Sequence, residues 1–169
     1  MSSGLSSVPE SVLEGATGPD VTLVVVTRTV IADAVVALAA TVGLTTQVLD
    51  DHDGPVAEAL AALAPGPRHA VVLTDHDAPG TAEVIRAALA SGAGYVGMMG
   101  SRSRARGVFE ALRAEGQTDP ALEHLHVPVG LDTGGRTAGE MGLSVVAEVV
   151  AWANGKLVRA GDRSGLAAP

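Results

Sequence analysis

The sequence predicts an α/β fold: a three-layer, doubly wound parallel sheet of Rossmann-like type with helices on both faces. Short β-branched or apolar runs alternate with helical stretches of about 10–15 residues, the pattern of right-handed βαβ units. Hydrophobic residues make up 47% of the 169 residues, yet the chain has one Trp, one Tyr and one Phe. The core must therefore consist of Ala, Val and Leu, which suit helices packed closely on a parallel sheet.

The first half of the chain is predicted to begin with a strand over 21–26. This segment is a continuous β-branched run, typical of a strand buried on both faces. An alanine-rich helix over 32–42 follows and ends at Gly43, because glycine readily takes the conformation that stops a helix. The same patterns then predict a strand, a short helix and a third strand over 45–49, 55–63 and 70–74.

The second half continues the alternation. A helix over 81–90 is stopped by Gly92, and a helix over 102–114 places Val108, Phe109 and Leu112 on one side. The remaining predicted elements are strands over 95–99 and 125–127, a helical turn over 119–123 and a long apolar helix over 137–152.

We expect one domain over 20–154, flanked by flexible tails over 1–19 and 155–169, which are polar and contain glycine. The first tail lacks the basic start and apolar core of a signal peptide. No apolar run reaches the length needed to cross a membrane. We therefore expect a cytoplasmic protein with no membrane partner.

The composition also argues against several classes of function. A net charge of −8 argues against a general nucleic-acid binder, which would carry a basic face. The few aromatic residues leave little for stacking on single-stranded bases. Because the chain has no cysteine, disulfides and thiolate metal ligands are excluded.

The loop after the first strand does not fit a dinucleotide. Binding NAD or NADP there requires a G-x-G-x-x-G loop, so that the backbone can approach the pyrophosphate. Residues 27–32 contain no glycine. Asp50 stands where an acid would hold the ribose, but without that loop we expect no NAD(P) binding.

Acidic clusters follow the second and third predicted strands. Asp50 ends one strand, and Asp75, His76 and Asp77 follow the next. We expect these two strands to lie side by side, so that the clusters could share a divalent cation. The alternative is that these residues form Asx turns and cap the following helices.

A glycine-rich loop with an arginine precedes the helix over 102–114. Gly97 and Gly100 allow close backbone approach, Ser101 is a good N-cap, and Arg102 opens the first turn. Because a cation at a helix N-terminus opposes the helix dipole, we expect a bound anion such as phosphate. The alternative is a solvated basic turn balanced by nearby acids.

A second such loop precedes the last helix. Gly130 permits a positive φ, and Asp132 is the acid of the loop. Thr137 and Glu140 have the spacing of a capping box, and Glu148 continues a polar stripe along the helix. In one interpretation, Asp132 and Glu140 line a ligand site. In the alternative, Glu140 only closes the capping box and Glu148 faces water.

These motifs together resemble the XdhC/CoxI family. The similarity runs from about Val21 to Trp152 and matches the C-terminal Rossmann-like domain of that family. It is strongest in three segments: Tyr95–Arg102, Leu125–Asp132 and Arg136–Glu148. The positions that match the family pattern are Gly100, Ser101, Arg102, Gly130, Leu131, Asp132, Thr137 and Glu140. With Gly97, they are the candidate cofactor-binding residues.

The resemblance implies an accessory factor for molybdenum hydroxylases such as xanthine dehydrogenase. Such proteins bind the molybdenum cofactor, a pterin phosphate, and deliver it to the apoenzyme, so the implied role is a chaperone rather than an enzyme. The family's glycine loop after the first strand is replaced here by Thr27–Ala32, and its separate N-terminal domain is missing from this sequence. Two other readings stay open: a nucleotide-dependent oxidoreductase, and a regulatory module that has lost its ligand.

The last helix also suggests an assembly. Residues 141–152 are apolar almost all round, which indicates burial on more than one side. Because part of that surface could face a second copy, we expect a homodimer.

Overall fold

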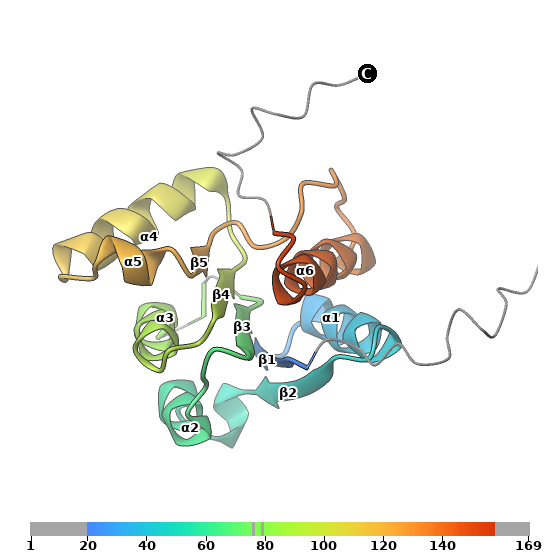
Figure 1. Ribbon diagram of the computed structural model, residues 1–169, viewed down its shortest axis with the longest axis horizontal. Coiled ribbons are helices and arrows are strands. Elements are labelled where there is room, and N and C mark those ends of the chain that lie inside the picture. Colours follow the sequence, from blue (N-terminus) through green and yellow to red (C-terminus); the bar gives the residue numbers. More distant parts are fainter. Residues whose placement is uncertain (1–19, 76, 79, 158–169) are drawn as a thin grey trace, which may run out of the picture.

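Five parallel strands form one sheet in the computed structural model of the chain (Figure 1). The structure describes residues 20–75, 77–78 and 80–157, so His76 and the predicted tails, apart from 155–157, lie outside the described residues. The strand order is β2-β1-β3-β4-β5. The strands are β1 (Thr22–Val26), β2 (Thr45–Leu49), β3 (His69–Leu73), β4 (Tyr95–Met98) and β5 (Leu125–His126).

Helices cover both faces of the sheet, as predicted for a doubly wound fold. In Figure 1, α1 and α6 lie on one face, and α2 and α3 lie on the other. Every predicted helix and strand is present, and the bounds agree within two residues. The helices are α1 (Val30–Thr41), α2 (Val56–Leu63), α3 (Thr81–Ala90), α4 (Arg102–Ala114), α5 (Asp119–Leu122) and α6 (Ala138–Ala153).

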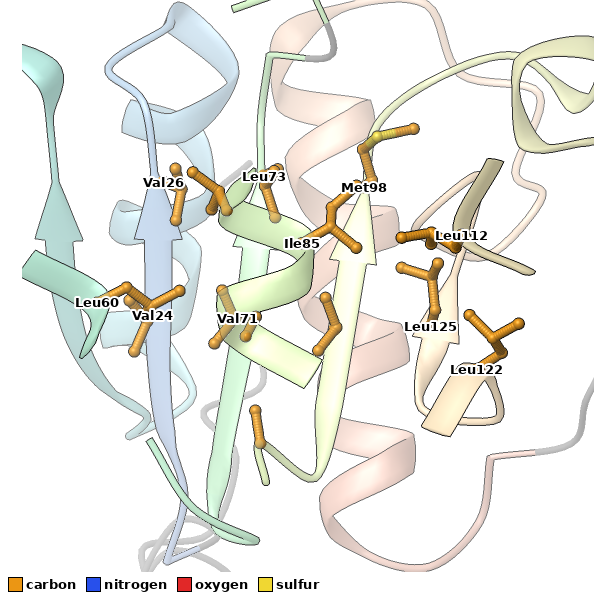
Figure 2. Close-up of a cluster of buried hydrophobic side chains, with 14 residues drawn as sticks. Val24, Val26, Leu60, Val71, Leu73, Ile85, Met98, Leu112, Leu122 and Leu125 are labelled. Atoms are coloured by element: carbon orange, nitrogen blue, oxygen red, sulfur yellow. The ribbon is translucent and has the colours of Figure 1, made fainter. Parts of the chain in front are cut away.

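The core consists of two aliphatic layers, one on each face of the sheet. Figure 2 shows the layer beneath α2, α3, α4 and α5, in which Val24 and Val71 of the sheet meet Ile85 and Leu112 of the helices. On the other face, Val25 and Val72 pack against Val35 of α1 and Val145 of α6. Neighbouring positions along one strand serve opposite layers, which explains the continuous apolar runs of the sequence.

Helix α6 packs against α1 as well as the sheet. Gly142 allows this approach, since a Cβ there would lie 2.9 Å from the Cβ of Ala34 in α1. This contact within the chain explains much of the apolar surface of α6. The homodimer that this surface suggested stays a prediction. None of the helices in the described part of the chain is both long and apolar enough to span a membrane.

The strand order corrects one prediction. The second and third strands do not lie side by side, because β1 pairs with β2 along one edge and with β3 along the other. The chain reverses its direction of travel across the sheet after β2 and passes over β1. Parallel neighbours are about 4.8 Å apart, so β2 and β3 are separated by roughly twice that distance.

Candidate functional site

A cleft of about 780 Å³ lies over β5, between α4 and α5 on one side and α6 on the other. Its floor includes His126 of β5 and Glu148 of α6, and its apolar wall includes Phe109 and Leu122. Its mouth is formed by the loop that joins β5 to α6, together with Arg102 at the start of α4. The volume is in the range of clefts that bind cofactors and small molecules, about 300–1,000 Å³.

The start of α4 meets the second glycine-rich loop at this mouth. Arg102 follows the first loop and Asp132 belongs to the second, and Arg102 Nη2 lies 3.1 Å from Asp132 Oδ2. Both side chains are largely exposed, at 85% and 66%, so this ion pair stabilises the fold by at most about 1 kcal/mol. Both are therefore accessible to a ligand at the mouth of the cleft.

The start of α4 has the predicted cap. Ser101 Oγ accepts a hydrogen bond from the backbone N–H of Arg104 at 3.2 Å. Arg104 is paired with Asp77, with Nη2 and Oδ1 2.7 Å apart. Nearby acids thus balance part of this basic turn, as the alternative reading proposed. Arg102 lines the cleft, whereas Arg104 does not.

Two candidate glycines have clear packing roles. Gly97 lies within β4, where a Cβ would come within 2.5 Å of Val129 Cγ2. Gly130 has a φ of +100°, and a Cβ there would lie 2.5 Å from Ser144 Oγ on α6. The Leu131 N–H donates to the carbonyl of Ser144 at 3.2 Å. These contacts hold the second loop against α6 and fix one wall of the cleft.

Thr137 and Glu140 form the capping box of α6. Glu140 Oε2 accepts hydrogen bonds from the N–H groups of Arg136 and Thr137 and from the Thr137 hydroxyl, each at 2.9 Å. The hydrogen bonds from the Thr137 and Arg136 backbone hold the pKa of Glu140 below its usual value. The lining of the cleft includes neither residue. Glu140 thus closes the box, as the alternative reading proposed.

Glu148 is buried at the floor of the cleft rather than facing water. Its Oε1 accepts a hydrogen bond from the Tyr95 hydroxyl at 2.9 Å and lies 3.3 Å from His126 Nδ1. The Tyr95 and His126 rings are stacked, with centroids 4.3 Å apart. Burial, reinforced by the nearby Glu148, raises the pKa of the Tyr95 hydroxyl well above its usual value.

Sequence reasoning missed Tyr95 and His126 as parts of this group. The available signal was polarity in otherwise apolar elements, since His126 lies in a short buried strand and Glu148 in an apolar helix. The sequence pattern did not reveal that Tyr95 and Glu148, 53 positions apart, would meet.

The carboxyl ends of β1 and β3, the usual ligand position in this fold, are closed by the chain itself. The Thr74 hydroxyl lies 3.0 Å from the carbonyl of Val26 and 2.9 Å from that of Thr27. Thr27 has a φ of +73°, a conformation that favours glycine. The side chain of Arg28 reaches Asp50, with Nε and Oδ2 3.0 Å apart.

Asp50, the candidate for holding a ribose or a metal, is buried and already paired. Its Oδ1 lies 2.9 Å from His52 Nδ1 and accepts the His52 N–H at 3.2 Å. The hydrogen bond with the His52 side chain, followed by one with Asp51, lowers the pKa of Asp50 to about 2. Ligand atoms of Asp50, Asp51 and His52 lie within 4.8 Å of one another, a grouping that a cation could use.

The other acidic cluster is separate from Asp50. Asp75 Oδ1 accepts the N–H of Asp77 at 2.9 Å, which is the Asx turn of the alternative reading. Asp77 also pairs with Arg104. Because β1 lies between β2 and β3, the two strands are not neighbours, and the expected reason for a cation shared by Asp50 and Asp75 does not hold.

Comparisons with known proteins agree with this architecture. A crystal structure described as a xanthine dehydrogenase from Bacillus halodurans superposes with a TM-score of 0.65 and 23% identity, over 82% of this chain and 44% of that one. The chain thus spans less than half of that protein, and at this identity the likeness shows the fold. The comparison with curated protein sequences gave no match. A family model described as the XdhC Rossmann domain matches residues 23–149, so the chain belongs to the XdhC Rossmann-domain family.

Proposed function

We propose that this chain is an accessory factor for a xanthine dehydrogenase-type molybdenum enzyme. It binds the molybdenum cofactor, or a related pterin phosphate, in the cleft over β5 and delivers it to the apoenzyme. The observation that supports this most is that Arg102, which directly follows the first glycine-rich loop, meets the second loop at one cleft, in a chain of the XdhC family. The role proposed is that of a carrier in which the bound group is protected, rather than that of an enzyme.

The residues at the mouth suit the phosphate of such a ligand. The N-terminus of α4, with 13 residues, presents backbone N–H groups and a partial positive charge to an anion. Arg102 there is exposed and held by one carboxylate, which a phosphate can replace with two parallel hydrogen bonds. Arg136 also lines the mouth and is exposed.

The interior of the cleft suits the ring system. Phe109, Leu122 and Met141 provide apolar surface, and Glu148 and His126 provide polar groups at the floor. The bound cofactor would supply the molybdenum and its dithiolene ligand to the client enzyme. This chain's part is to hold the pterin and exclude water, since without cysteine it offers no thiolate to the metal.

The closed end of β1 favours this reading over a nucleotide-dependent oxidoreductase. A dinucleotide at the usual position needs a bare backbone at residue 27 and a free acid at residue 50. Here residue 27 carries a threonine side chain, and the Asp50 carboxylate is engaged by Arg28.

The proposal is tested by what the protein carries and passes on. Mass spectrometry of protein purified from cells that make the molybdenum cofactor should detect a bound pterin. Protein from cells blocked in pterin synthesis is the control and should carry none. Added to molybdenum-free xanthine dehydrogenase, the loaded protein should restore activity faster than free cofactor does. Absence of both the pterin and the activation would contradict the proposal.

A further inference from the structure

The Glu148 carboxylate is a buried acid whose two oxygens have different surroundings. The side chain is 9% exposed, and its Oε1 receives the Tyr95 hydroxyl and approaches His126. Across the described residues, no fully enclosed side-chain oxygen or nitrogen lacks a hydrogen-bond partner. Since the hydrogen bond from Tyr95 and the contact with His126 both involve Oε1, Oε2 is reached from the cleft, which Glu148 lines.

A carboxylate placed in this way needs hydrogen-bond donors from the cleft. Burying a charged group costs several kcal/mol unless it is paired; here Tyr95 donates one hydrogen bond to Oε1, the His126 ring lies beside the same oxygen, and Oε2 has neither neighbour. A ligand with two adjacent N–H donors would give Oε2 its donor and place the second N–H beside Oε1, which Tyr95 and His126 approach from the protein side. The 2-amino-4-oxopyrimidine edge of a pterin, which guanine shares, presents this pair of donors.

We propose that Glu148 recognises the amidine-like edge of the ligand's heterocycle, and that Tyr95 positions its carboxylate. This inference rests on the proposed function and deepens it, by assigning the end of the ligand that points inward. Gly130 contacts α6 at Ser144, and Glu148 lies one helical turn farther along. The heterocycle therefore lies at the floor, while its phosphate reaches Arg102 at the mouth.

The role of Tyr95 follows from its fixed protonation. Because burial raises its pKa, the hydroxyl keeps its proton and acts as a donor toward Oε1 throughout the neutral range. The stacked His126 ring holds the tyrosine ring in place. The carboxylate is thus oriented before the ligand arrives, which reduces the entropy lost on binding.

The experiment compares two matched ligands by fluorescence titration. One is neopterin phosphate, and the other is the 2-oxo (lumazine) analogue with the same phosphorylated side chain, which lacks the 2-amino donor. The wild-type protein should bind the pterin at least about 10-fold more tightly, because a charged acceptor that loses its donor loses about 1.5–3 kcal/mol. Glu148→Gln should lose this preference, while Glu123→Gln, a matched change at the exposed rim of the same cleft, should retain it.

A second pair of ligands separates the two sources of this edge. Guanosine monophosphate and inosine monophosphate also differ by the 2-amino group, so a preference within this pair that exceeds the pterin preference identifies guanine as the ring at the floor. Tyr95→Phe should weaken the pterin preference while leaving binding of the 2-oxo analogue unchanged. A merely structural role for Tyr95 would weaken both ligands equally.

The outcomes distinguish this inference from the proposed function. Equal affinity of the wild-type protein for the pterin and its 2-oxo analogue overturns the role of Glu148 and leaves the carrier function standing. If neither ligand binds, both proposals are wrong. If Glu148→Gln does not fold, the ligand comparison on the wild-type protein decides the question.

Discussion

Replacing Arg102 by alanine separates ligand binding from folding at the mouth of the cleft. Arg102 makes a single exposed ion pair with Asp132, which stabilises the fold by about 0–1 kcal/mol. It also places a cation at the N-terminus of α4, which costs about 0.3–1 kcal/mol against the helix dipole. The two effects have opposite signs and similar size, so Arg102→Ala should change the free energy of unfolding by less than about 1 kcal/mol.

The effect on an anionic ligand should be much larger. A guanidinium–phosphate hydrogen bond contributes about 1.5–3 kcal/mol net, so Arg102→Ala should weaken binding of neopterin phosphate by roughly 10- to 150-fold. Arg102→Lys should recover only part of this loss, because lysine cannot form two parallel hydrogen bonds to one phosphate. Unphosphorylated neopterin, which lacks the anion, should bind wild type and variant alike.

Fluorescence titration and thermal unfolding of the same samples measure both quantities. Arg106→Ala is the matched control, since Arg106 is an exposed arginine one turn farther along α4 and outside the lining of the cleft. It should bind neopterin phosphate like the wild type. If Arg102→Ala bound the ligand as well as Arg106→Ala did, the phosphate would not lie at this mouth. If it unfolded instead, the exposed pair with Asp132 would be more important for stability than its exposure allows.

Three further predictions concern the packing of Gly130, the charge of Asp50 and the binding of NADH. Gly130→Ala should lower the free energy of unfolding, measured by urea unfolding, by about 2–4 kcal/mol, because of the positive φ of Gly130 and a clash with Ser144. Gly134→Ala is the control: Gly134 has a φ of +70° but lies in open space, so its replacement should cost less. Equal losses would contradict this packing. The folded pKa of Asp50 is depressed to about 2, so its contribution to stability is present above about pH 4 and is lost as the pH falls toward 2. Asp50→Asn should therefore flatten the dependence of the free energy of unfolding on pH between about pH 4 and about pH 2. An unchanged pH dependence in the variant would contradict this role of Asp50. Calorimetry with NADH should show no micromolar binding, and a clear saturable signal would overturn the argument from the closed end of β1.

The elements of the fold were predictable because their signals are local. A continuous run such as 22–26 is apolar at each position since both faces of the strand are buried, and Ser101 caps α4 through its own side chain. The strand order was not predictable in the same way. The connection from β2 to β3 carries no residue that specifies which side of β1 the chain returns to, so the expected neighbourhood of Asp50 and Asp75 was wrong.

In the candidate site, too, roles that depend on nearby residues were predictable, and roles that depend on residues distant in the sequence were not. Glu140 and Glu148 occupy equivalent positions in the polar stripe of α6, yet one closes a cap and the other is buried under the cleft. The first role depends on residues three positions away, and sequence spacing indicates it. The second depends on Tyr95 and His126, which the sheet brings to α6 from distant parts of the chain. Likewise, Gly97 and Gly130 looked suited to ligand approach, and the structure shows that their α-carbons are covered by Val129 and Ser144.

A phosphorylated pterin bound in the cleft over β5 can be located directly. Backbone amide NMR spectra recorded during a titration with neopterin phosphate report which residues sense the ligand. The largest shifts are expected at the amides of 100–104 and 130–136, with a further change at Glu148. Little change is expected at residues 27–29 and at Asp50. Shifts concentrated at 27–29 and Asp50, or no saturable shift at all, would contradict binding in this cleft.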